Sequence, residues 1–195
     1  MNAERSTTRG VAHYPGSTAP APARARIVVL LNLVALLLAA CGGNDNVRSA
    51  KPSSARVAMP RNWPVVTPDD PDRANAVLIR AIGLVGTPYR YGGNTPQGGF
   101  DCSGLVNYVF RDMANVALPR TSRDLAAQGP RIQPERLAAA DLVFFANGGT
   151  VTHVGIYVGE GRFVHAPSTG GTVRLDHLDG PYWVSHYAGA RRVLR

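Results

Sequence analysis

The sequence is poor in several residue types and patterns that define common protein classes. Its 195 residues contain two cysteines and two tryptophans, and Lys51 is the single lysine. No run of five or more basic residues occurs, so a nucleic-acid-binding tail is not indicated and no nucleic acid is expected as a partner. No internal repeat, dinucleotide loop or phosphate loop is present either. These absences leave one ordinary globular domain with extensions as the simplest organisation.

The basic charge that is present is spread along the chain. Arginine supplies nearly all of it, and the formal net charge is +8. A diffusely basic surface favours an acidic polymer as a partner through long-range attraction. An arginine-rich composition with no selected role explains the same charge equally well.

The N-terminal part of the sequence has the pattern of a targeting segment. Two arginines, Arg24 and Arg26, precede an apolar run at residues 27–38. The run has the length of a signal-peptide core and is too short to span a bilayer comfortably. It ends in Leu-Ala-Ala-Cys, which resembles the bacterial lipobox and implies cleavage before Cys41 and diacylation of its thiol. Residues 1–40 are therefore predicted to be a signal peptide, with an uncleaved anchor and an incidental cysteine as the alternative.

Residue 42 is glycine rather than aspartate, which by resemblance to Gram-negative lipoproteins favours sorting to the outer membrane. We therefore predict a protein of the cell envelope, attached to the membrane through a lipid anchor and facing the periplasm. Residues 41–70 lack hydrophobic periodicity and are expected to form a flexible tether spanning roughly 30 Å. Two acyl chains suffice for stable attachment. The folded domain is predicted to cover residues 71–195.

Hydrophobic periodicity divides residues 71–195 into helices first and strands second. Apolar residues recur at helical spacing in residues 72–86, in the segment after Cys102 and in residues 122–128. Alternation at period two then predicts strands at residues 141–146, 152–158, 162–166, 172–175 and 183–194. Helices followed by strands indicate an α+β domain with the helices packed on an antiparallel sheet.

Cys102 stands where a glycine-rich loop meets a helix whose apolar stripe begins at Leu105. A thiol at a helix N-terminus feels the positive end of the helix dipole, which favours the reactive thiolate. Asp101 can cap the start of this helix. A buried, inert cysteine is the alternative, but polar and glycine neighbours suit a nucleophile better. With Cys41 assigned to the lipid, no disulfide is expected, although two cysteines in an exported protein would ordinarily suggest one.

His153 is the candidate base. Val154, Ile156 and Val158 share one face of the strand predicted at residues 152–158, and His153 projects from the other face. A core histidine would lie on the valine face, so the pattern favours a functional histidine. An ordinary surface histidine is the alternative.

His165 follows on the next strand, and its position depends on the length of the loop between the two strands. A two-residue loop would pair it with Ile156 and send it to the core. A three-residue loop would pair it with Gly155 and place it diagonal to His153, roughly 7–8 Å away at Cα. Gly161 can adopt the left-handed conformation that ends a three-residue loop, so we predict this second register. His165 would then orient His153 and stabilise its charged form.

Six segments, in this order, resemble the NlpC/P60 family of cell-wall endopeptidases. They are Gly-Thr-Pro-Tyr-Arg-Tyr-Gly-Gly from position 86, Asp-Cys-Ser-Gly-Leu-Val from 101, Leu-Pro-Arg-Thr-Ser from 118, Asp-Leu-Val-Phe-Phe from 141, His-Val-Gly-Ile-Tyr from 153 and Phe-Val-His-Ala from 163. The resemblance implies a papain-like α+β core with Cys102, His153 and His165 as a catalytic triad. It also implies cleavage of amide bonds in peptidoglycan stem peptides or their cross-links, without a metal or other cofactor.

The resemblance also assigns residues around the nucleophile. Tyr89 matches a family tyrosine thought to help hold the oxyanion, and Asp101 and Ser103 match positions that contact substrate in some members. Ala140 departs from the family, which often has glycine there, and the loop ahead of Asp101 is one residue longer than in some members. These departures concern loop shape. A monomer is expected, and because no separate wall-binding repeat is found, targeting would rest on the lipid and the tether.

Three other functions stay open at this point. Cys102, His153 and His165 with a water would make an acceptable catalytic zinc set, although no His-Glu-x-x-His motif accompanies them. A non-catalytic lipoprotein that only binds the wall is disfavoured because neither the cysteine nor the histidine is missing. An acyltransferase acting on lipid or peptide is the third, because related folds transfer acyl groups.

Overall fold

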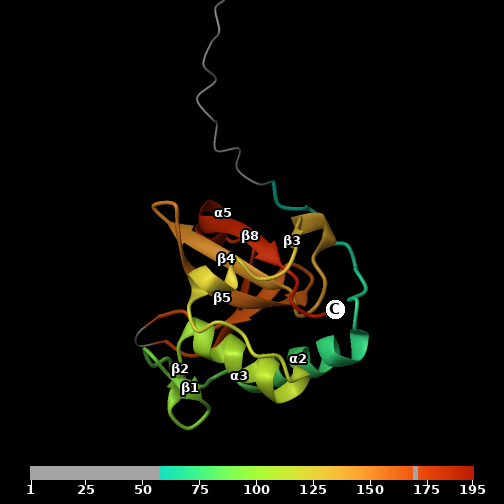
Figure 1. The fold of residues 1–195 in the computed structure, drawn as a ribbon. Helices are drawn as coiled ribbons and strands as arrows, with labels where there is room; N and C mark the ends of the chain where they lie inside the picture. The colour runs from blue at the N-terminus through green and yellow to red at the C-terminus, as the bar shows by residue number, and fades with distance from the viewer. Residues whose placement is uncertain (1–57, 169–170) are drawn as a thin grey trace, which may run out of the picture. The chain divides into compact units, whose positions relative to one another are not determined.

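The computed structural model describes residues 58–168 and 171–195 (Figure 1). The signal peptide predicted at residues 1–40, the lipidated Cys41 and the first part of the predicted tether lie outside the described residues. Within the described part of the chain, no helix is both long enough and apolar enough to cross a membrane.

Two helices form one layer of the fold. Helix α2 spans Pro71–Gly83 and starts after Asp70, whose carboxylate accepts the backbone N–H of Arg73 at 3.0 Å. Helix α3 spans Cys102–Ala114 and ends at Asn115, which adopts the left-handed conformation. The shorter helical segments are α4 at Ser122–Leu125, a 3-10 turn at Pro134–Arg136 and α5 at Pro181–His186.

An antiparallel sheet of six strands forms the second layer, in the order β3-β8-β4-β5-β6-β7. Figure 1 shows α2 and α3 together along one side of this sheet. The predicted α+β arrangement of helices on an antiparallel sheet is thereby confirmed. The strands are β3 at Arg131–Ile132, β4 at Leu142–Asn147, β5 at Thr150–Gly159, β6 at Arg162–His165, β7 at Arg174–His177 and β8 at Tyr187–Arg191, and a separate hairpin pairs β1 at Asn94–Thr95 with β2 at Gly99–Phe100.

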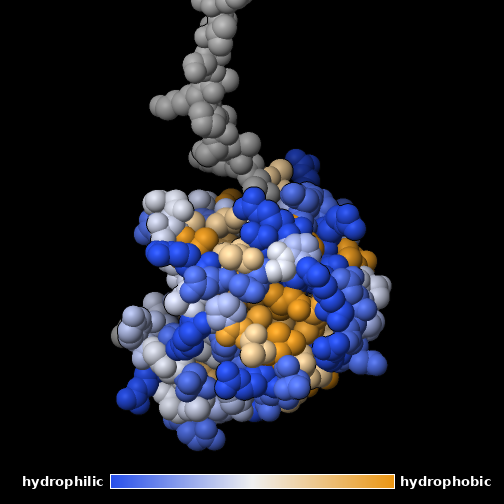
Figure 2. Space-filling model, viewed as in Figure 1, coloured by the Kyte–Doolittle hydropathy of each residue, from blue (hydrophilic) through white to orange (hydrophobic). Residues whose placement is uncertain are grey.

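Apolar side chains cover both faces of the sheet. The larger cluster includes Val109 of α3 and Val154 of β5. The second cluster includes Tyr157 and Phe163, with Trp63 packed against it. Tyr157 is 2% exposed, so the face of β5 that the sequence pattern left open is also buried. On the surface seen in Figure 2, apolar residues gather in one central area with hydrophilic residues around it.

The β5–β6 hairpin has the predicted register. Ile156 pairs with Val164, which places Gly155 opposite His165. The loop itself is shorter than predicted, because only Glu160-Gly161 turns, with φ values of 52° and 72°. A bulge between Tyr157 and Gly159 of β5 accommodates one residue that has no partner on β6. The hairpin therefore combines a two-residue turn with the register predicted for a three-residue loop.

Three predicted elements have different limits. The strand predicted at residues 183–194 is wrong in its first part, because α5 occupies Pro181–His186 and β8 begins only at Tyr187. Pro181 has a fixed φ suited to the first helical position, and this local start outweighs the strand preference of the aromatic residues after it. The helix predicted at residues 122–128 is limited to α4, and the strand predicted at residues 172–175 is observed two residues further on, as β7.

Folded contacts begin upstream of α2. The ring of Trp63 packs against Tyr157 with centroids 6.0 Å apart. Its indole also lies against Gly161, where a Cβ would overlap the ring. Part of the segment predicted as a tether at residues 41–70 therefore packs on the domain, while residues 41–57 are outside the described range.

Candidate active site

Cys102 is the first residue of α3, and its side chain is half-buried. Asp101 caps the helix by accepting the backbone N–H of Gly104 at 2.7 Å, and it accepts the N–H of Gly92 at 2.9 Å. A Cβ on Gly104 would overlap the carbonyl oxygen of Gly93, so this glycine lets the preceding loop close over the helix start. The loop and the helix are thereby held together with the thiol at their junction.

An ion pair between Asp101 and Arg120 supports the same junction. The guanidinium donates to both carboxylate oxygens, at 2.8 and 2.7 Å, and to Ser103 Oγ at 2.6 Å. Burial raises the pKa of Asp101, but Arg120 and the amides of Gly104 and Gly92 outweigh burial and hold it below its usual range. The carboxylate is therefore ionised, and its oxygens are occupied by the groups that fix the start of α3.

The thiol of Cys102 is neutral at rest. Burial raises its pKa, and the carboxylate of Asp101 raises it further. The backbone amides of Val154, Ser103 and Cys102 itself act in the opposite direction without outweighing these two effects. The amides at the helix start favour the thiolate, as expected, but the pKa of Cys102 stays raised because the sulfur is desolvated next to an anion. The Val154 amide contact also places the sulfur against β5, one residue after His153.

His153, His165 and Asp176 form a hydrogen-bonded chain across β5, β6 and β7. His153 Nε2 lies 2.8 Å from His165 Nδ1, and His165 Nε2 lies 3.0 Å from Asp176 Oδ2. Burial raises the pKa of Asp176, but Arg174 and His165 lower it below its usual range, so the carboxylate is ionised and accepts. His165 then donates from Nε2 and accepts at Nδ1, which makes His153 the donor at Nε2. Nδ1 is left as the basic nitrogen of His153.

Both imidazoles are neutral at neutral pH. Burial lowers the pKa of His153 to about 3, and the neighbouring His165 adds to the effect while Asp176 opposes it. Burial lowers the pKa of His165 to about 4 in spite of Asp176. Trp183 covers both rings, stacking on His153 at a centroid distance of 5.6 Å and packing edge-on against His165 at 4.8 Å.

An open groove of about 480 Å³ runs past the thiol. Four of the predicted site residues, Tyr89, Asp101, Cys102 and Ser103, line this groove. Burial, with the nearby Cys102 and Asp101, raises the pKa of the Tyr89 phenol, so its hydroxyl keeps its proton and can donate. The other groove residues are Tyr91, Gly92, Arg120, Thr121, Ser122 and Thr152.

The two predicted histidines are placed differently from the groove residues. His153 is half-buried, and its neighbour Thr152 lines the groove. His165 is fully buried. The predicted side-by-side placement of the two histidines is confirmed by their hydrogen bond.

The sequence did not reveal Asp176 or the ion pair of Arg120. Asp176 lies opposite Phe163 in the β6–β7 pairing. The strand predicted at residues 172–175 stops short of Asp176, so no register brought it to His165. Arg120 belongs to one of the family-like segments, but its ion pair with Asp101 joins residues 19 positions apart and depends on the folded loop.

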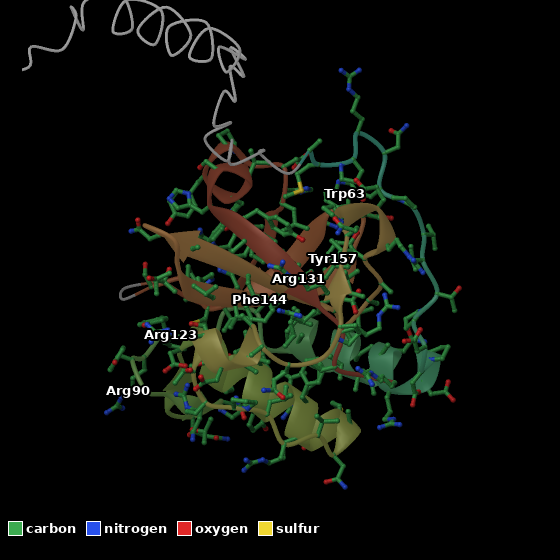
Figure 3. The ribbon with its side chains drawn as sticks, turned by 45° about the horizontal axis from the view of Figure 1, so that its top comes forward. Trp63, Arg90, Arg123, Arg131, Phe144 and Tyr157 are labelled. Atoms are coloured by element: carbon green, nitrogen blue, oxygen red, sulfur yellow. The ribbon has the colours of Figure 1, made fainter. Side chains whose placement is uncertain are left out.

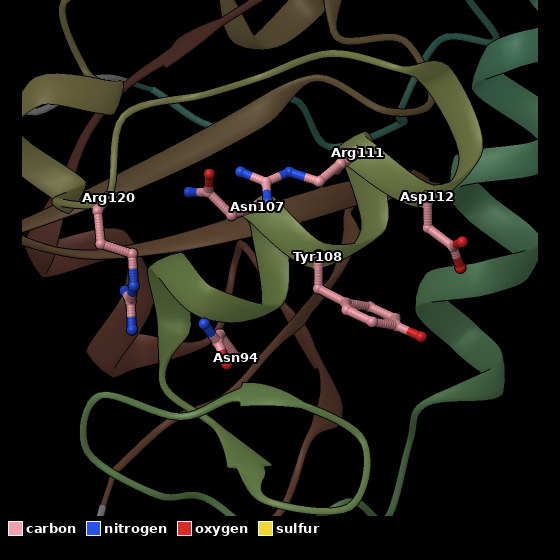
Figure 4. A pocket seen from close by; sticks show the side chains of 6 residues that line it. All are labelled: Asn94, Asn107, Tyr108, Arg111, Asp112 and Arg120. Carbon is pink, nitrogen blue, oxygen red and sulfur yellow. The ribbon is translucent and has the colours of Figure 1, made fainter.

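A second hollow, of about 360 Å³, lies beside α3 (Figure 4). Arg120 is shared with the groove, but its guanidinium is bonded to Asp101 and Ser103. The lining contains no thiol and no imidazole, so this hollow offers no nucleophile or base of the kind found at the groove. Its six lining residues are Asn94, Asn107, Tyr108, Arg111, Asp112 and Arg120.

The zinc alternative gains no support from the geometry. Across residues 58–168 and 171–195, no three or more histidine, cysteine, aspartate or glutamate side chains converge in a way that could hold a metal ion. His165 in particular uses one ring nitrogen for His153 and the other for Asp176. It therefore has no lone pair left for a metal.

Comparison with known proteins identifies a family for this chain. Residues 86–192, more than half of the chain, match the NlpC/P60 family. Murein DD-endopeptidase MepH of Escherichia coli K12 is 44% identical over 114 residues, which are 56% of this chain and 42% of MepH. Murein DD-endopeptidase MepS/Murein LD-carboxypeptidase of the same strain is 33% identical over 168 residues, which are 83% of this chain and 88% of that protein.

Solved structures agree as well. The crystal structure of an NlpC/P60 family protein from Bacillus cereus superposes with a TM-score of 0.60 at 33% identity, over 63% of this chain and 40% of the other. The resemblance seen in the sequence, the α+β fold and these matches are consistent with one another. The chain belongs to the NlpC/P60 family.

Proposed function

We propose that this chain is a peptidoglycan endopeptidase that hydrolyses amide bonds in stem peptides or their cross-links. Membership of the NlpC/P60 family makes it a cysteine-type peptidase. The observation that carries the proposal is the Cys102 thiol at a helix start, beside the hydrogen-bonded chain of His153, His165 and Asp176. The names of MepH and MepS, both murein endopeptidases, support the choice of substrate.

The first step is attack by Cys102 Sγ on the scissile carbonyl carbon, with transfer of the thiol proton to Nδ1 of His153. The carbonyl π electrons move to the oxygen, where the backbone N–H of Cys102 and the Tyr89 hydroxyl stabilise the oxyanion. The C–N bond then breaks, His153 gives its proton to the leaving nitrogen, and a thioester remains. Water deprotonated by His153 hydrolyses the thioester and restores the thiol.

The protonation states of the resting site decide what the other residues must do. Because the pKa of Cys102 is raised and that of His153 is lowered, the resting pair is neutral rather than an ion pair. His153 becomes positive only as the sulfur attacks. His165 and the ionised Asp176 then stabilise that positive charge through the hydrogen-bonded chain.

We also propose that the enzyme is a lipoprotein attached through Cys41 to the outer membrane, facing the periplasm and acting as a monomer. The support is the lipobox-like stretch and the glycine at position 42. A lipid anchor with a short tether would keep the groove within reach of a polymer that lies next to the membrane.

The test uses the purified full chain beside its Cys102→Ala variant. Each is incubated with isolated peptidoglycan and with soluble cross-linked and monomeric muropeptides, and the products are identified by mass spectrometry. We expect peptide fragments from the wild type alone, with masses that identify the cleaved bond. Circular dichroism establishes that both proteins are folded.

Three outcomes would count against the proposal. The absence of products from a folded wild type with a titratable thiol would overturn the endopeptidase function. Equal products from Cys102→Ala would remove Cys102 as nucleophile. Products that carry a transferred acyl group in place of a hydrolysed bond would favour the acyltransferase instead.

A further inference from the structure

A hollow of about 270 Å³ lies between α4 and the strands β4 and β8, and its lining does not include the thiol. Its floor is apolar, with Phe144 and Ala188 among the residues that form it. Its rim carries three arginines, Arg123, Arg131 and Arg191. Figure 3 shows Arg123 and Arg131 with Phe144 between them. The hollow therefore combines a small apolar floor with a strongly cationic edge.

Two of these arginines are held next to each other without a counter-ion. Arg131 and Arg191 are direct cross-strand partners in the β3–β8 pairing. Among the ion pairs of the described part of the chain, none joins a carboxylate to either of them or to Arg123. Burial and the charge of Arg131 both lower the pKa of Arg191. Like charges directly opposite in an antiparallel pair destabilise a sheet, and a bound anion would remove that cost.

A neighbouring hollow along β8 contains a buried polar atom without a partner. This smaller hollow, of about 150 Å³, shares Arg131 and Gly189 with the first. Tyr187 lines it and buries its phenolic oxygen without a hydrogen-bond partner among the described residues. Gly189 adds no side chain, and the nearest atom to a Cβ placed on it is in the Arg131 guanidinium, at 4.0 Å. Arg191 donates to the carbonyl oxygen of Gly129 at 3.1 Å. The Arg131 guanidinium beside Gly189 and the Tyr187 hydroxyl are the donors here that a bound acceptor could serve.

The hollow adjoins the groove that holds the thiol. In α4, Ser122 lines the groove and Arg123 lines the hollow. In β5, Thr152 lines the groove and Val151 lines the hollow. The contact between α4 and the start of β5 therefore forms a wall common to both. A peptide would have to extend from the groove across this wall to reach the three arginines.

We propose that the arginine-rimmed hollow is a subsite for a free carboxylate of the peptide substrate, on the stretch of stem peptide that extends beyond the scissile bond. This inference rests on the proposed endopeptidase function. Guanidinium groups bind carboxylates with two parallel hydrogen bonds, and the floor accepts only small apolar side chains. A short acidic peptide with methyl side chains fits both requirements.

The experiment compares two forms of one cross-linked muropeptide, with its carboxylates free and with them amidated. The ratio of kcat/KM for the two substrates is measured for the full-length wild type, Arg131→Gln and Arg123→Gln. We expect the preference for the free acid to fall about tenfold in each variant, mainly through KM, because a lost hydrogen bond to a charged group weakens binding by at least that factor. The exposed Arg61 gives the matched control, Arg61→Gln, which removes the same charge elsewhere.

An unchanged preference in both variants would overturn the subsite, and so would an equal loss in Arg61→Gln. If the wild type cleaves neither substrate, the proposed function fails. The subsite is then tested by a binding measurement that does not depend on catalysis. Isothermal titration of the free-acid muropeptide into full-length Cys102→Ala, with and without Arg131→Gln, then gives the answer. A dissociation constant about tenfold weaker in the double variant supports the subsite, and equal constants refute it.

Discussion

Asp176 decides which nitrogen of each histidine carries a proton. Its carboxylate accepts from His165, and the order of donors and acceptors then continues to His153. Trp183 Nε1 and Arg174 also donate to the same carboxylate oxygen, at 3.0 and 2.9 Å, and hold it in place. Two neutral imidazoles in series present a basic nitrogen to the thiol only in this tautomeric order. Under the proposed mechanism, Asp176 is therefore a positioning residue for the base His153, which it does not touch.

Replacement of Asp176 by alanine is expected to lower kcat by about 10²-fold with little change in KM, because the wrong tautomer of a base costs up to about 10⁴-fold when the lost partner is adjacent. Asp176→Asn should lie between this variant and the wild type, since its side-chain oxygen still accepts from His165. Steady-state kinetics on a soluble muropeptide measures both. A rise in KM without loss of kcat would contradict the assignment.

The buried neutral histidines also make stability depend on pH. Their folded-state pKa values of about 3 and about 4 lie below the ordinary value of 6.5. Between pH 6.5 and about 4 the unfolded chain therefore binds more protons than the folded one, and stability is lost as the pH falls. The free energy of unfolding should drop by about 1.4 kcal/mol per pH unit for each histidine. Urea denaturation at a series of pH values measures the slope.

The variant His165→Gln separates this effect from the titration of carboxylates. The buried Asp141 has a raised pKa, which acts with the opposite sign. It is present in both proteins, so the difference in slope between the wild type and His165→Gln reports the histidine. Identical slopes would mean that His165 is not buried as a neutral ring.

At this scale the sequence predicted which residues meet but not their ionisation. The contact between His153 and His165 could be predicted because both residues stand in family-like segments on neighbouring strands. The neutral thiol could not be found, because its pKa depends on burial and on the side of the loop from which Asp101 approaches. Asp176 was not predicted because its contact with His165 depends on the pairing of a third strand, β7, with β6.

The junction of α3 with the loop that precedes β1 and contains Gly93 is the element that sets the position of the thiol. Gly104 is the contact point, since any Cβ there overlaps the Gly93 carbonyl oxygen. Gly104→Ala should push the loop away, weaken the Asp101 cap and lower the free energy of unfolding by about 1–3 kcal/mol. Activity on muropeptides should fall further than stability, because the loop also carries Tyr89 into the groove. Thermal denaturation and kinetics measure the two effects.

Gly83→Ala is the matched control for this prediction. Gly83 ends α2, and a Cβ there meets no atom within 4 Å. The change should leave activity intact and raise the free energy of unfolding by up to about 1 kcal/mol, as expected for glycine to alanine in a helix. Similar losses in both variants would show that close packing at Gly104 is not the cause.

At the scale of elements, local sequence signals predicted the core helices and the β5–β6 register. Features that depend on the surrounding fold were not predicted. Pro181 starts a helix inside a segment that is rich in strand-forming residues. The two-residue β5–β6 turn keeps the register of a longer loop because β5 contains a bulge. A bulge leaves no periodic hydrophobic pattern in the sequence, so it could not be predicted. Ala140 adopts a φ of 70°, a backbone conformation that glycine reaches with less strain than alanine.

For the whole molecule, the predicted domain start at residue 71 leaves out Trp63, which packs on the domain. Trp63 joins the second apolar cluster against Tyr157, and the sequence could not show this because the cluster draws on residues far apart. The general division into helices and sheet could be predicted, since each layer has its own hydrophobic period.

Lipid attachment is the prediction that concerns the chain as a whole. Expressed in a Gram-negative host with an alkyne-labelled palmitate, the wild type should take up the label and sediment with membranes. Cys41→Ser should do neither, because the thiol is the proposed site of acylation. Equal labelling of the two proteins would refute the role of Cys41. Muropeptide cleavage by both, after detergent extraction, checks that the catalytic domain is unaffected.

Trp183 gives the active site an optical reporter of its own. It is one of two tryptophans in the chain, stacked on His153, edge-on to His165 and bonded to Asp176. An indole in contact with an imidazole loses fluorescence when that imidazole gains a proton. With Trp63 replaced by phenylalanine, all tryptophan emission would come from this one ring. A stopped-flow trace could then follow the proton's arrival on the base and its departure within a single turnover, without any attached dye.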